Sequence, residues 1–278
     1  MKKFWKNANK RLKAGIIITL FFVLLGFGVY YIPHINPFAY NTYPAKLNPS
    51  LAHWLGTTSM GQDVFWLLIE AIHNSLMIGL IVALIGTVVG VFVGLLAGFS
   101  GGLLDRVLTV VTDTFVVIPS LPILVLMTAL MKGSSTVIMM ALVLAMFAWA
   151  WPSRQIRSLA LSIKERDFIH TAWFSGEGTI QIVVTEILPF ALTWSLSNFM
   201  NATLAAIASE SSLAVLGLSP ANLISLGNMI QWARARNAIF ARQWFWIGSP
   251  IVATVLLFVG LFLLITGYND YLSMKRGR

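Results

Sequence analysis

The stretch SLMIGLIVALIGTVVGVFVGLLAG, residues 75–98, contains no charged residue and has the length of a membrane-spanning helix. At a rise of 1.5 Å per residue, about 20 helical residues cross the hydrocarbon core of a bilayer. Gly86, Gly90, Gly94 and Gly98 recur at every fourth position and therefore share one helix face. We expect this face to be a groove that lets another helix backbone approach closely, with a ligand role as the alternative.

Five more apolar runs make the chain an expected all-α, polytopic membrane protein with six transmembrane helices. The predicted spans are residues 14–32, 75–98, 104–131, 135–151, 189–209 and 250–268. Composition agrees, because apolar residues form 58% of the chain and charged residues only 10%, against roughly a quarter charged in soluble domains. Pro119 and Pro122 predict a kink in the third span; a hairpin or re-entrant segment is the alternative there.

The basic residues predict the orientation of the spans. With both termini cytoplasmic, most of the 19 Lys and Arg residues fall in inner segments, as the positive-inside rule requires. These are Lys2, Lys3, Lys6, Lys10, Arg11, Lys13, Arg106, Arg154, Arg157, Lys164, Arg166, Lys275, Arg276 and Arg278; the outer ones are Lys46, Lys132, Arg234, Arg236 and Arg242. Because they flank spans and form no continuous patch, the net charge of +9 does not indicate nucleic-acid binding.

This orientation divides the chain into inner and outer segments. We read the run 14–32 as a retained span, since it is too long for a signal peptide and no small-residue cleavage site follows it. The expected segments are a basic cytoplasmic N-terminus (1–13), an extracytoplasmic segment with an amphipathic helix (33–74), a cytoplasmic loop (152–188), an extracytoplasmic loop (210–249) and a cytoplasmic tail (269–278).

Motifs for catalysis are missing from the sequence. There is no cysteine, no Gly-x-x-x-x-Gly-Lys-Ser/Thr phosphate loop, no His-Glu-x-x-His and no Gly-x-Ser-x-Gly. His34, His53, His73 and His170 are scattered along the chain. We therefore expect a non-enzymatic chain that binds no metal or cofactor of its own.

One polar island interrupts the apolar chain: KERDFIHTAWFSGEGTIQIVVTEILP, residues 164–189. Residues 164–174 can form a short amphipathic helix, Gly176 and Gly178 break it, and Thr179 can cap a second helix that runs up to Pro189. A helix, a glycine turn and a helix make a shape that can protrude and dock. The alternative is a loop lying on lipid headgroups, helped by Trp173 and Phe174.

This island resembles the cytoplasmic signature loop of ABC importer permeases. Ala172, Gly176, Ile187, Leu188 and Pro189 fit that signature, whereas His170 and Thr171 replace its usual acidic residue and first alanine. Three other stretches extend the resemblance over almost the whole chain, to the C-type permease subunit of dipeptide and oligopeptide importers. They are HWLGTTSMGQDVFWLLIEAIHNSL from His53, GGLLDRVLTVVTDTFVVIPS from Gly101, and LAVLGLSPANLISLGNMIQWARARNAI from Leu213.

The resemblance implies a type I importer permease fold, with a five-helix core at residues 75–268, in a prokaryotic plasma (inner) membrane. It implies a second homologous permease, two ATPase subunits that bind ATP and Mg, and an extracytoplasmic solute-binding protein. The loop would contain the helix that couples to an ATPase. Its expected contact residues are Arg166, Asp167, His170, Thr171, Ala172, Phe174, Gly176 and Glu177. Peptides are the first expectation for the solute, with oligosaccharides second and nickel as a further alternative.

Polar residues inside the spans are candidates for the transport pathway. Placing the Asp113 carboxylate in lipid costs free energy unless the group faces water or a partner, so this side chain is expected to point inward. Asn198, Asn201 and Glu210 form a polar row on the fifth span. Each could contact solute or hydrogen-bond a neighbouring helix, and titration of Asp113 and Glu210 keeps a proton-coupled carrier open as an alternative.

The outer loop combines arginines with tryptophans. Arg234 and Arg236 are candidate contacts for an extracytoplasmic receptor. Trp232, Trp244 and Trp246 could form an interfacial belt, cover the pathway or seat the receptor; the belt is the expectation for Trp244 and Trp246.

Overall fold

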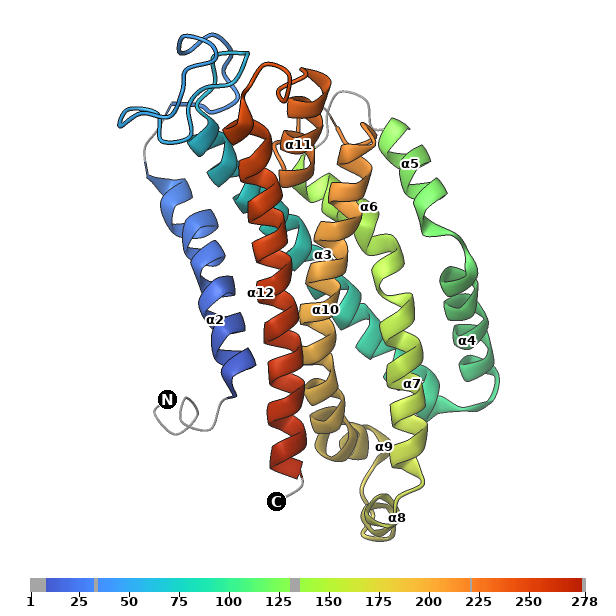
Figure 1. The fold of residues 1–278 in the computed structure, drawn as a ribbon. Coiled ribbons are helices and arrows are strands. Elements are labelled where there is room, and N and C mark those ends of the chain that lie inside the picture. The colour runs from blue at the N-terminus through green and yellow to red at the C-terminus, as the bar shows by residue number, and fades with distance from the viewer. Residues whose placement is uncertain (1–8, 33–34, 131–135, 221, 277–278) are drawn as a thin grey trace.

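The computed structural model describes residues 9–32, 35–130, 136–220 and 222–276, and every regular element in these ranges is helical (Figure 1). Lys2, Lys3, Lys6, His34, Lys132 and Arg278 lie outside the described residues. The elements are α2 (Lys10–Val23), η1 (Leu24–Gly28), η2 (Val29–Tyr31), α3 (Val64–Ser100), α4 (Gly102–Val117), α5 (Ser120–Leu130), α6 (Val137–Ala148), α7 (Ala150–Lys164), α8 (Asp167–Phe174), α9 (Thr179–Ile182), η3 (Val183–Ile187), α10 (Leu188–Val215), α11 (Leu226–Ala235) and α12 (Trp244–Arg276).

Within the described residues, four helices are long and apolar enough to cross a membrane, and two bent pairs raise the number to six if each pair is one span. The four are residues 10–31, 64–100, 179–215 and 244–274. The pair α4 and α5 is bent by 79° and the pair α6 and α7 by 40°. The first break lies at Ile118 and Pro119, where the predicted kink occurs, because the residue before a proline is driven out of the helical conformation.

Several helices extend beyond the apolar runs that predict them. The amphipathic helix expected within residues 33–74 is not a separate element, because it is the first part of the 37-residue helix α3. Asp63 caps α3 by accepting hydrogen bonds from the backbone N–H groups of Phe65 and Trp66. Within the expected outer loop 210–249, α10 continues to Val215, and α11 forms a helix of its own.

The four-residue glycine repeat of α3 packs against the backbone of α6 and α7. A Cβ atom placed on Gly86 would lie 2.8 Å from Ala148 Cβ, and one on Gly90 would lie 2.6 Å from Pro152 Cβ. The same construction at Gly98 meets Ala160 Cβ at 2.8 Å, and Gly94 faces Ser153 and Ile156. Only glycine permits this approach, and the position of α7 on α3 follows from it.

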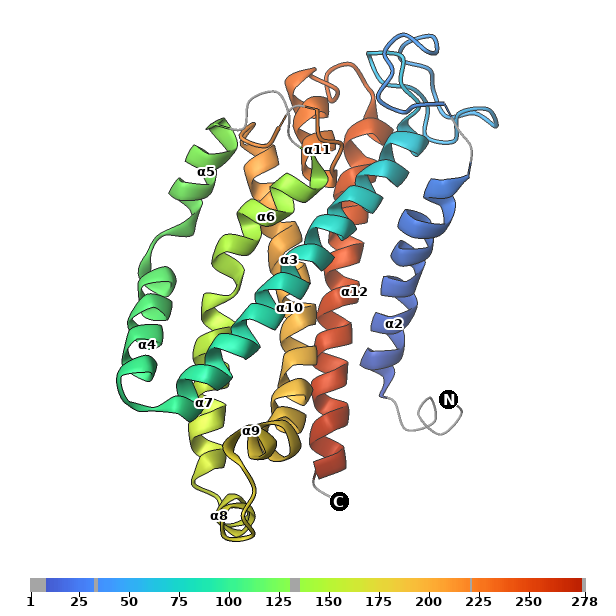
Figure 2. The same cartoon turned by 180° about the vertical axis from the view of Figure 1, so that it is seen from behind.

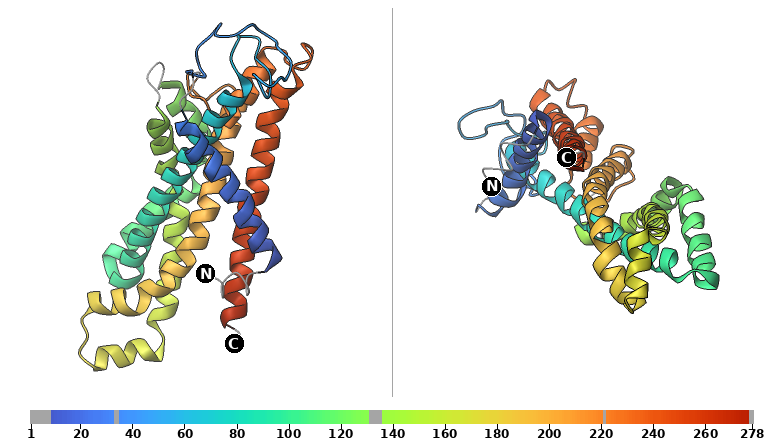
Figure 3. Two further views of the ribbon diagram at one scale, coloured as in Figure 1. Left: turned by 90° about the vertical axis from the view of Figure 1, so that its left-hand side faces the viewer. Right: turned by 90° about the horizontal axis from the view of Figure 1, so that it is seen from below.

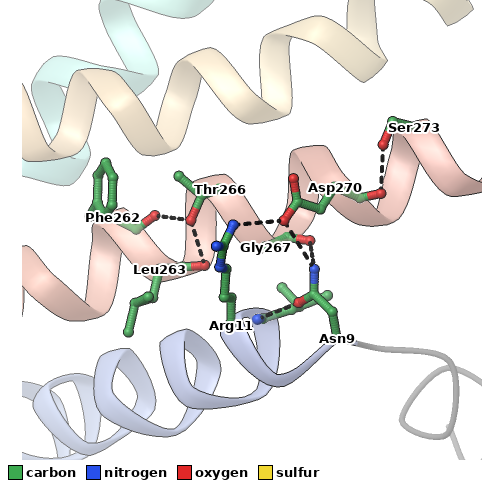
Figure 4. A network of polar contacts seen from close by, with 9 residues as sticks. Asn9, Arg11, Phe262, Leu263, Thr266, Gly267, Asp270 and Ser273 are labelled. Atoms are coloured by element: carbon green, nitrogen blue, oxygen red, sulfur yellow. Dashed lines mark hydrogen bonds and ion pairs between the residues drawn. The ribbon is translucent and has the colours of Figure 1, made fainter.

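Helix α2 packs against α12. A polar network joins the start of α2 to the last turns of α12 (Figure 4). Asn9 caps α2 by accepting a hydrogen bond from Leu12 N at 2.7 Å, and its Nδ2 donates to Gly267 O at 3.3 Å. Arg11 forms an exposed ion pair with Asp270 at 3.4 Å. The start of the first span is thereby attached to the last turns of the final helix.

The molecule has two distinct ends. Residues 35–63, the connection before α11 and α11 itself lie at one end, which we call the loop end (Figures 1 and 2). Helices α8 and α9 lie at the opposite end, the hairpin end, on the same side as the start of α2 and the end of α12 (Figure 1). Viewed along the helices, the spans form an elongated row with α2 near one extreme and α4 at the other (Figure 3, right).

Candidate functional site

Helices α8 and α9 form a hairpin, residues 167–182, that projects beyond the ends of the spans (Figure 3, left). The short helix predicted over residues 164–174 is confirmed only from Asp167 to Phe174, because α7 runs to Lys164 and Arg166 is the N-cap of α8. Gly176 then adopts φ +85°, a left-handed conformation that favours glycine, and Glu177 N donates to Ala172 O at 3.2 Å to close the turn.

The second half of the hairpin differs from the expectation in two respects. Thr179 is the first helical residue and not the cap, because the cap position is held by Gly178 and shows no side-chain hydrogen bond. The helix also does not end at Pro189. It passes through the π-helical segment η3 into α10, and Pro189 lies in the first turn of α10. Because proline has no backbone N–H, it is tolerated in the first turn of a helix, where that N–H would lack an intrahelical partner.

The hairpin has one buried face and one open face. Ile169, Ala172 and Ile182 are buried in a cluster with Phe99 of α3 and Ile163 of α7. The clustered side chains anchor the hairpin to the ends of two spans.

The open face contains most of the predicted coupling residues. Arg166, Asp167, His170, Thr171, Phe174 and Gly176 are exposed, Glu177 is half-buried, and Ala172 alone belongs to the buried face. Phe174 is 92% exposed and Ile180 is 80% exposed. Apolar side chains this open on a projecting hairpin form a surface suited to a protein partner.

Two cavities lie along one face of α10. The upper cavity, of 320 Å³, is lined by residues of α3, α5, α6, α7 and α10. The lower cavity, of 800 Å³, opens toward the hairpin end between α7, α10 and α12. Both are lined by Trp151, Asn198 and Asn201. Pathway residues proposed from the sequence thus meet at the junction of two cavities.

The two asparagines differ in their surroundings. Asn198 is buried, and its Nδ2 donates to Thr87 Oγ1 of α3 at 3.1 Å, so it joins two helices as well as lining both cavities. Asn201 is exposed, and its Nδ2 donates to Ser197 O within α10. Helix packing therefore accounts for part of the role of Asn198, and not for that of Asn201.

The two acidic candidates lie elsewhere. Asp113 on α4 is half-exposed, 3.9 Å from the Arg154 guanidinium of α7. Glu210 is fully buried near the loop end, where Ser225 Oγ donates to its Oε1 at 2.7 Å and Ser219 Oγ lies at 3.5 Å. Neither residue lines the two cavities. The structure does not bring Glu210 together with Asn198 and Asn201 at these cavities, and Asp113 lies apart from all three.

The arginines and tryptophans predicted to act at the loop end also differ from one another in their surroundings. Both arginines are exposed, but Arg234 Nη2 is already engaged, since it donates to Val215 O at 2.8 Å and satisfies a carbonyl at the end of α10. The expected membrane-interface position of Trp246 is wrong, since this side chain is 1% exposed and belongs to a buried cluster with residues of α3, α10 and α11. Trp244, at 58% exposed, is open as an interfacial residue requires.

The polar and aromatic contacts that were not predicted from the sequence include the following three. Arg157 of α7 donates through Nε and Nη2 to Asp105 of α4 at 2.6 and 2.8 Å. The Trp151 and Trp194 rings stack with their centroids 6.2 Å apart. His53 Nδ1 lies 2.7 Å from Asp63 Oδ2 and ties the 35–63 segment to the start of α3. The residues in each pair come from separate elements or opposite ends of a loop, so spacing along the chain carries no signal of the contacts.

Comparisons with known proteins identify the family. Residues 90–277 match the binding-protein-dependent transport system inner membrane component family. The whole chain is 31% identical to the oligopeptide transport system permease protein OppC of Mycobacterium tuberculosis, covering 96% of that protein.

Two further relatives cover most of the chain. An oligopeptide transport system permease protein OppC of Lactococcus lactis is 26% identical over 93% of this chain and 90% of its own length. The nickel transport system permease protein NikC of Escherichia coli is 28% identical over 88% of both chains. The chain therefore belongs to the binding-protein-dependent transport system inner membrane component family, and it is a multi-pass membrane permease subunit of an ABC importer with the type I importer fold.

Proposed function

We propose that this chain forms half of the translocation pathway of an oligopeptide importer and couples it to ATP hydrolysis through the α8–α9 hairpin. The observation that carries the proposal is the hairpin itself. Its buried face is anchored to α3 and α7 by Ile169 and Ile182, while Phe174 and Ile180 are open to a partner. A force applied to this surface would be transmitted to the ends of α3 and α7.

The proposed assembly contains a second homologous permease, two ATPase subunits that bind ATP and Mg, and an extracytoplasmic solute-binding protein. The hairpin end is placed in the cytoplasm with both termini. Lys10, Arg11, Arg106, Lys164 and Arg166 all belong to segments at this end, which supports that orientation under the positive-inside rule. Arg236, exposed at the loop end, is the better of the two candidate arginines for a receptor contact.

Peptides are the proposed solute because full-length similarity links the chain to oligopeptide permeases. The nickel permease relative keeps nickel as an alternative, and oligosaccharides remain a second organic candidate. The decisive assay measures ATP hydrolysis by the complete complex in lipid, with its binding protein and peptides, oligosaccharides or nickel in turn. Stimulation by peptides alone supports the proposal, and stimulation only by another solute overturns the substrate assignment.

The coupling surface is tested by Phe174→Glu, with Phe240→Glu as the matched control. Both phenylalanines are highly exposed, 92% and 87%, but Phe240 follows α11 at the loop end. Phe174→Glu should abolish co-purification of the ATPase subunits and solute-stimulated hydrolysis, because a charge would have to be desolvated in the contact. Phe240→Glu should retain both. Equal ATPase recovery with the two variants would exclude a contact at Phe174.

Solute uptake by the complete complex, reconstituted in vesicles, tests the alternative of a proton-coupled carrier. Uptake that persists after the proton gradient is collapsed, but stops when ATP is removed, supports the importer. Uptake with the opposite dependence would identify a proton-coupled carrier.

A further inference from the structure

One face of α10 lines both cavities over about four turns. Trp194, Asn198, Asn201, Ala205 and Ser209 follow one another at spacings of three or four residues and lie on the same helix face. Trp194 lines the lower cavity and the two asparagines line both cavities. Ala205 and Ser209 line the upper cavity. The stripe changes along its length from aromatic to carboxamide to small side chains.

Trp151 stands opposite this stripe at the junction of the cavities. It is 54% exposed, it lines both cavities, and its ring stacks on Trp194 with 29° between the planes. Its position depends on the glycine groove, because Pro152, the next residue, packs directly on Gly90 of α3. The bend between α6 and α7 occurs two residues earlier, at Trp149. Tight packing thus holds one indole against the other across the cavity junction.

The two asparagines present hydrogen-bonding groups beside the indoles. Each carboxamide uses its Nδ2 in a bond to the protein, to Thr87 Oγ1 for Asn198 and to Ser197 O for Asn201. A carboxamide has two N–H donors and a carbonyl acceptor, so an acceptor and a donor of each remain for another molecule. That pair of groups is complementary to a peptide bond, which also offers one donor and one acceptor.

We propose that Trp151, Trp194, Asn198 and Asn201 form a binding subsite for the backbone of the transported peptide. The planar indole faces contact apolar and amide surface without selecting a particular side chain. The carboxamides pair with a backbone N–H or C=O that every peptide carries. The subsite is therefore tolerant of peptide sequence and selective for the amide backbone. It rests on the proposed function, since it assumes that peptides enter this pathway.

Absence of cysteine from the chain makes a direct test possible. Asn201→Cys is prepared in the complete complex, with any cysteines of the partner subunits replaced, and is reconstituted in vesicles. Its rate of reaction with a water-soluble methanethiosulfonate reagent is measured with and without a transported tripeptide, binding protein and ATP. Ser212→Cys is the control, because Ser212 is an exposed residue of the same helix that lines neither cavity.

The expected result is a several-fold slower reaction of the Asn201→Cys variant in the presence of peptide, with no change for Ser212→Cys. An unchanged Asn201→Cys rate, in a complex whose ATP hydrolysis the peptide stimulates, overturns the subsite and leaves the proposed function standing. Lack of stimulation by peptides in the unmodified complex overturns the proposed function instead. A rate slowed equally by an oligosaccharide assigns the groups to a different solute and also overturns the proposal.

Substitution of the indoles gives a second readout. Trp151→Leu and Trp194→Leu should each raise the KM for peptide uptake by about three- to tenfold, which is the range of one aromatic contact. Recovery of the intact complex, measured alongside uptake, shows whether each variant still folds and assembles. Trp244→Leu, at an exposed tryptophan of the loop end, should leave the KM unchanged. Unchanged KM values in both subsite variants would contradict a role for the indoles.

Discussion

Ser225 donates its hydroxyl hydrogen to Glu210 Oε1 at 2.7 Å, and the same hydroxyl oxygen accepts from Asn228 N at the start of α11. One serine therefore caps α11 and attaches it to α10. Asn228 Nδ2 continues the network through Ser219 Oγ and the carbonyls of Pro220 and Leu223. The connection between the two helices at the loop end is organised around a buried carboxylate.

Glu210→Ala should destabilise the protein by about 1–3 kcal/mol, because buried hydroxyl donors lose their acceptor. Glu210→Gln should be milder, since it retains a carbonyl oxygen of similar reach. The measurement is thermal unfolding of the purified chain in detergent. Ser212→Ala, an exposed change on the same helix, is the control and should shift the midpoint little. Equal midpoints for Glu210→Ala and Ser212→Ala would show that the network adds no stability.

Gly90→Ala should cost about 1–3 kcal/mol, the usual range for overpacking. The new methyl group would lie 2.6 Å from Pro152 Cβ and 2.9 Å from Trp149 O, so α7 would have to move away from α3. Gly248→Ala is the matched control, because a Cβ there meets no atom within 4 Å. The control should be neutral or stabilising, since alanine favours helix over glycine by roughly 0.5–1 kcal/mol. Detergent unfolding of both variants compares them, and a harmless Gly90→Ala would refute close packing at this face.

The Asp105–Arg157 pair should show a measurable coupling between α4 and α7. Its two short hydrogen bonds are bidentate, and both side chains are largely shielded. Asp105→Ala and Arg157→Ala should each destabilise by roughly 1.5–3 kcal/mol, and the double variant should lose less than their sum. Arg11→Ala, which breaks the exposed pair with Asp270, should cost less than about 1 kcal/mol. Strict additivity of the Asp105 and Arg157 changes would mean that the two groups do not stabilise each other.

Gly176→Ala should disturb the hairpin without any steric clash. No atom lies within 4 Å of a Cβ placed there, but φ is +85°, a conformation that costs a non-glycine residue about 1–2 kcal/mol. The turn should shift and weaken binding of the ATPase subunits by roughly the corresponding five- to thirtyfold. Gly178→Ala is the control, since it is equally open and has φ −73°. Titration of ATPase binding to each variant separates the two, and identical affinities would exclude a role for the Gly176 turn in docking.

The helical membrane architecture follows largely from the sequence, because crossing a bilayer requires long apolar runs whose backbone bonds are satisfied internally. The bend at Pro119 and the close approach at Gly90 are similarly local consequences of a missing N–H and a missing side chain. Helix ends were less predictable. The runs 75–98 and 189–209 are only parts of the helical stretches 64–100 and 179–215, which continue through residues such as Glu70 and Glu186, where hydropathy no longer marks a helix.

By itself, the sequence determined the class of protein, the expected spans and the polar island that becomes the hairpin. Only the tertiary structure decided which side chains meet. Trp151 reaches Trp194 because Gly90 admits Pro152, and Glu210 is buried because the chain folds Ser219 and Ser225 back over α10. Trp246 lies in the core because residues of α3, α10 and α11 gather with it in one buried cluster. Such contacts join residues far apart along the chain or across separate elements, so they depend on helix packing, which local periodicity does not encode.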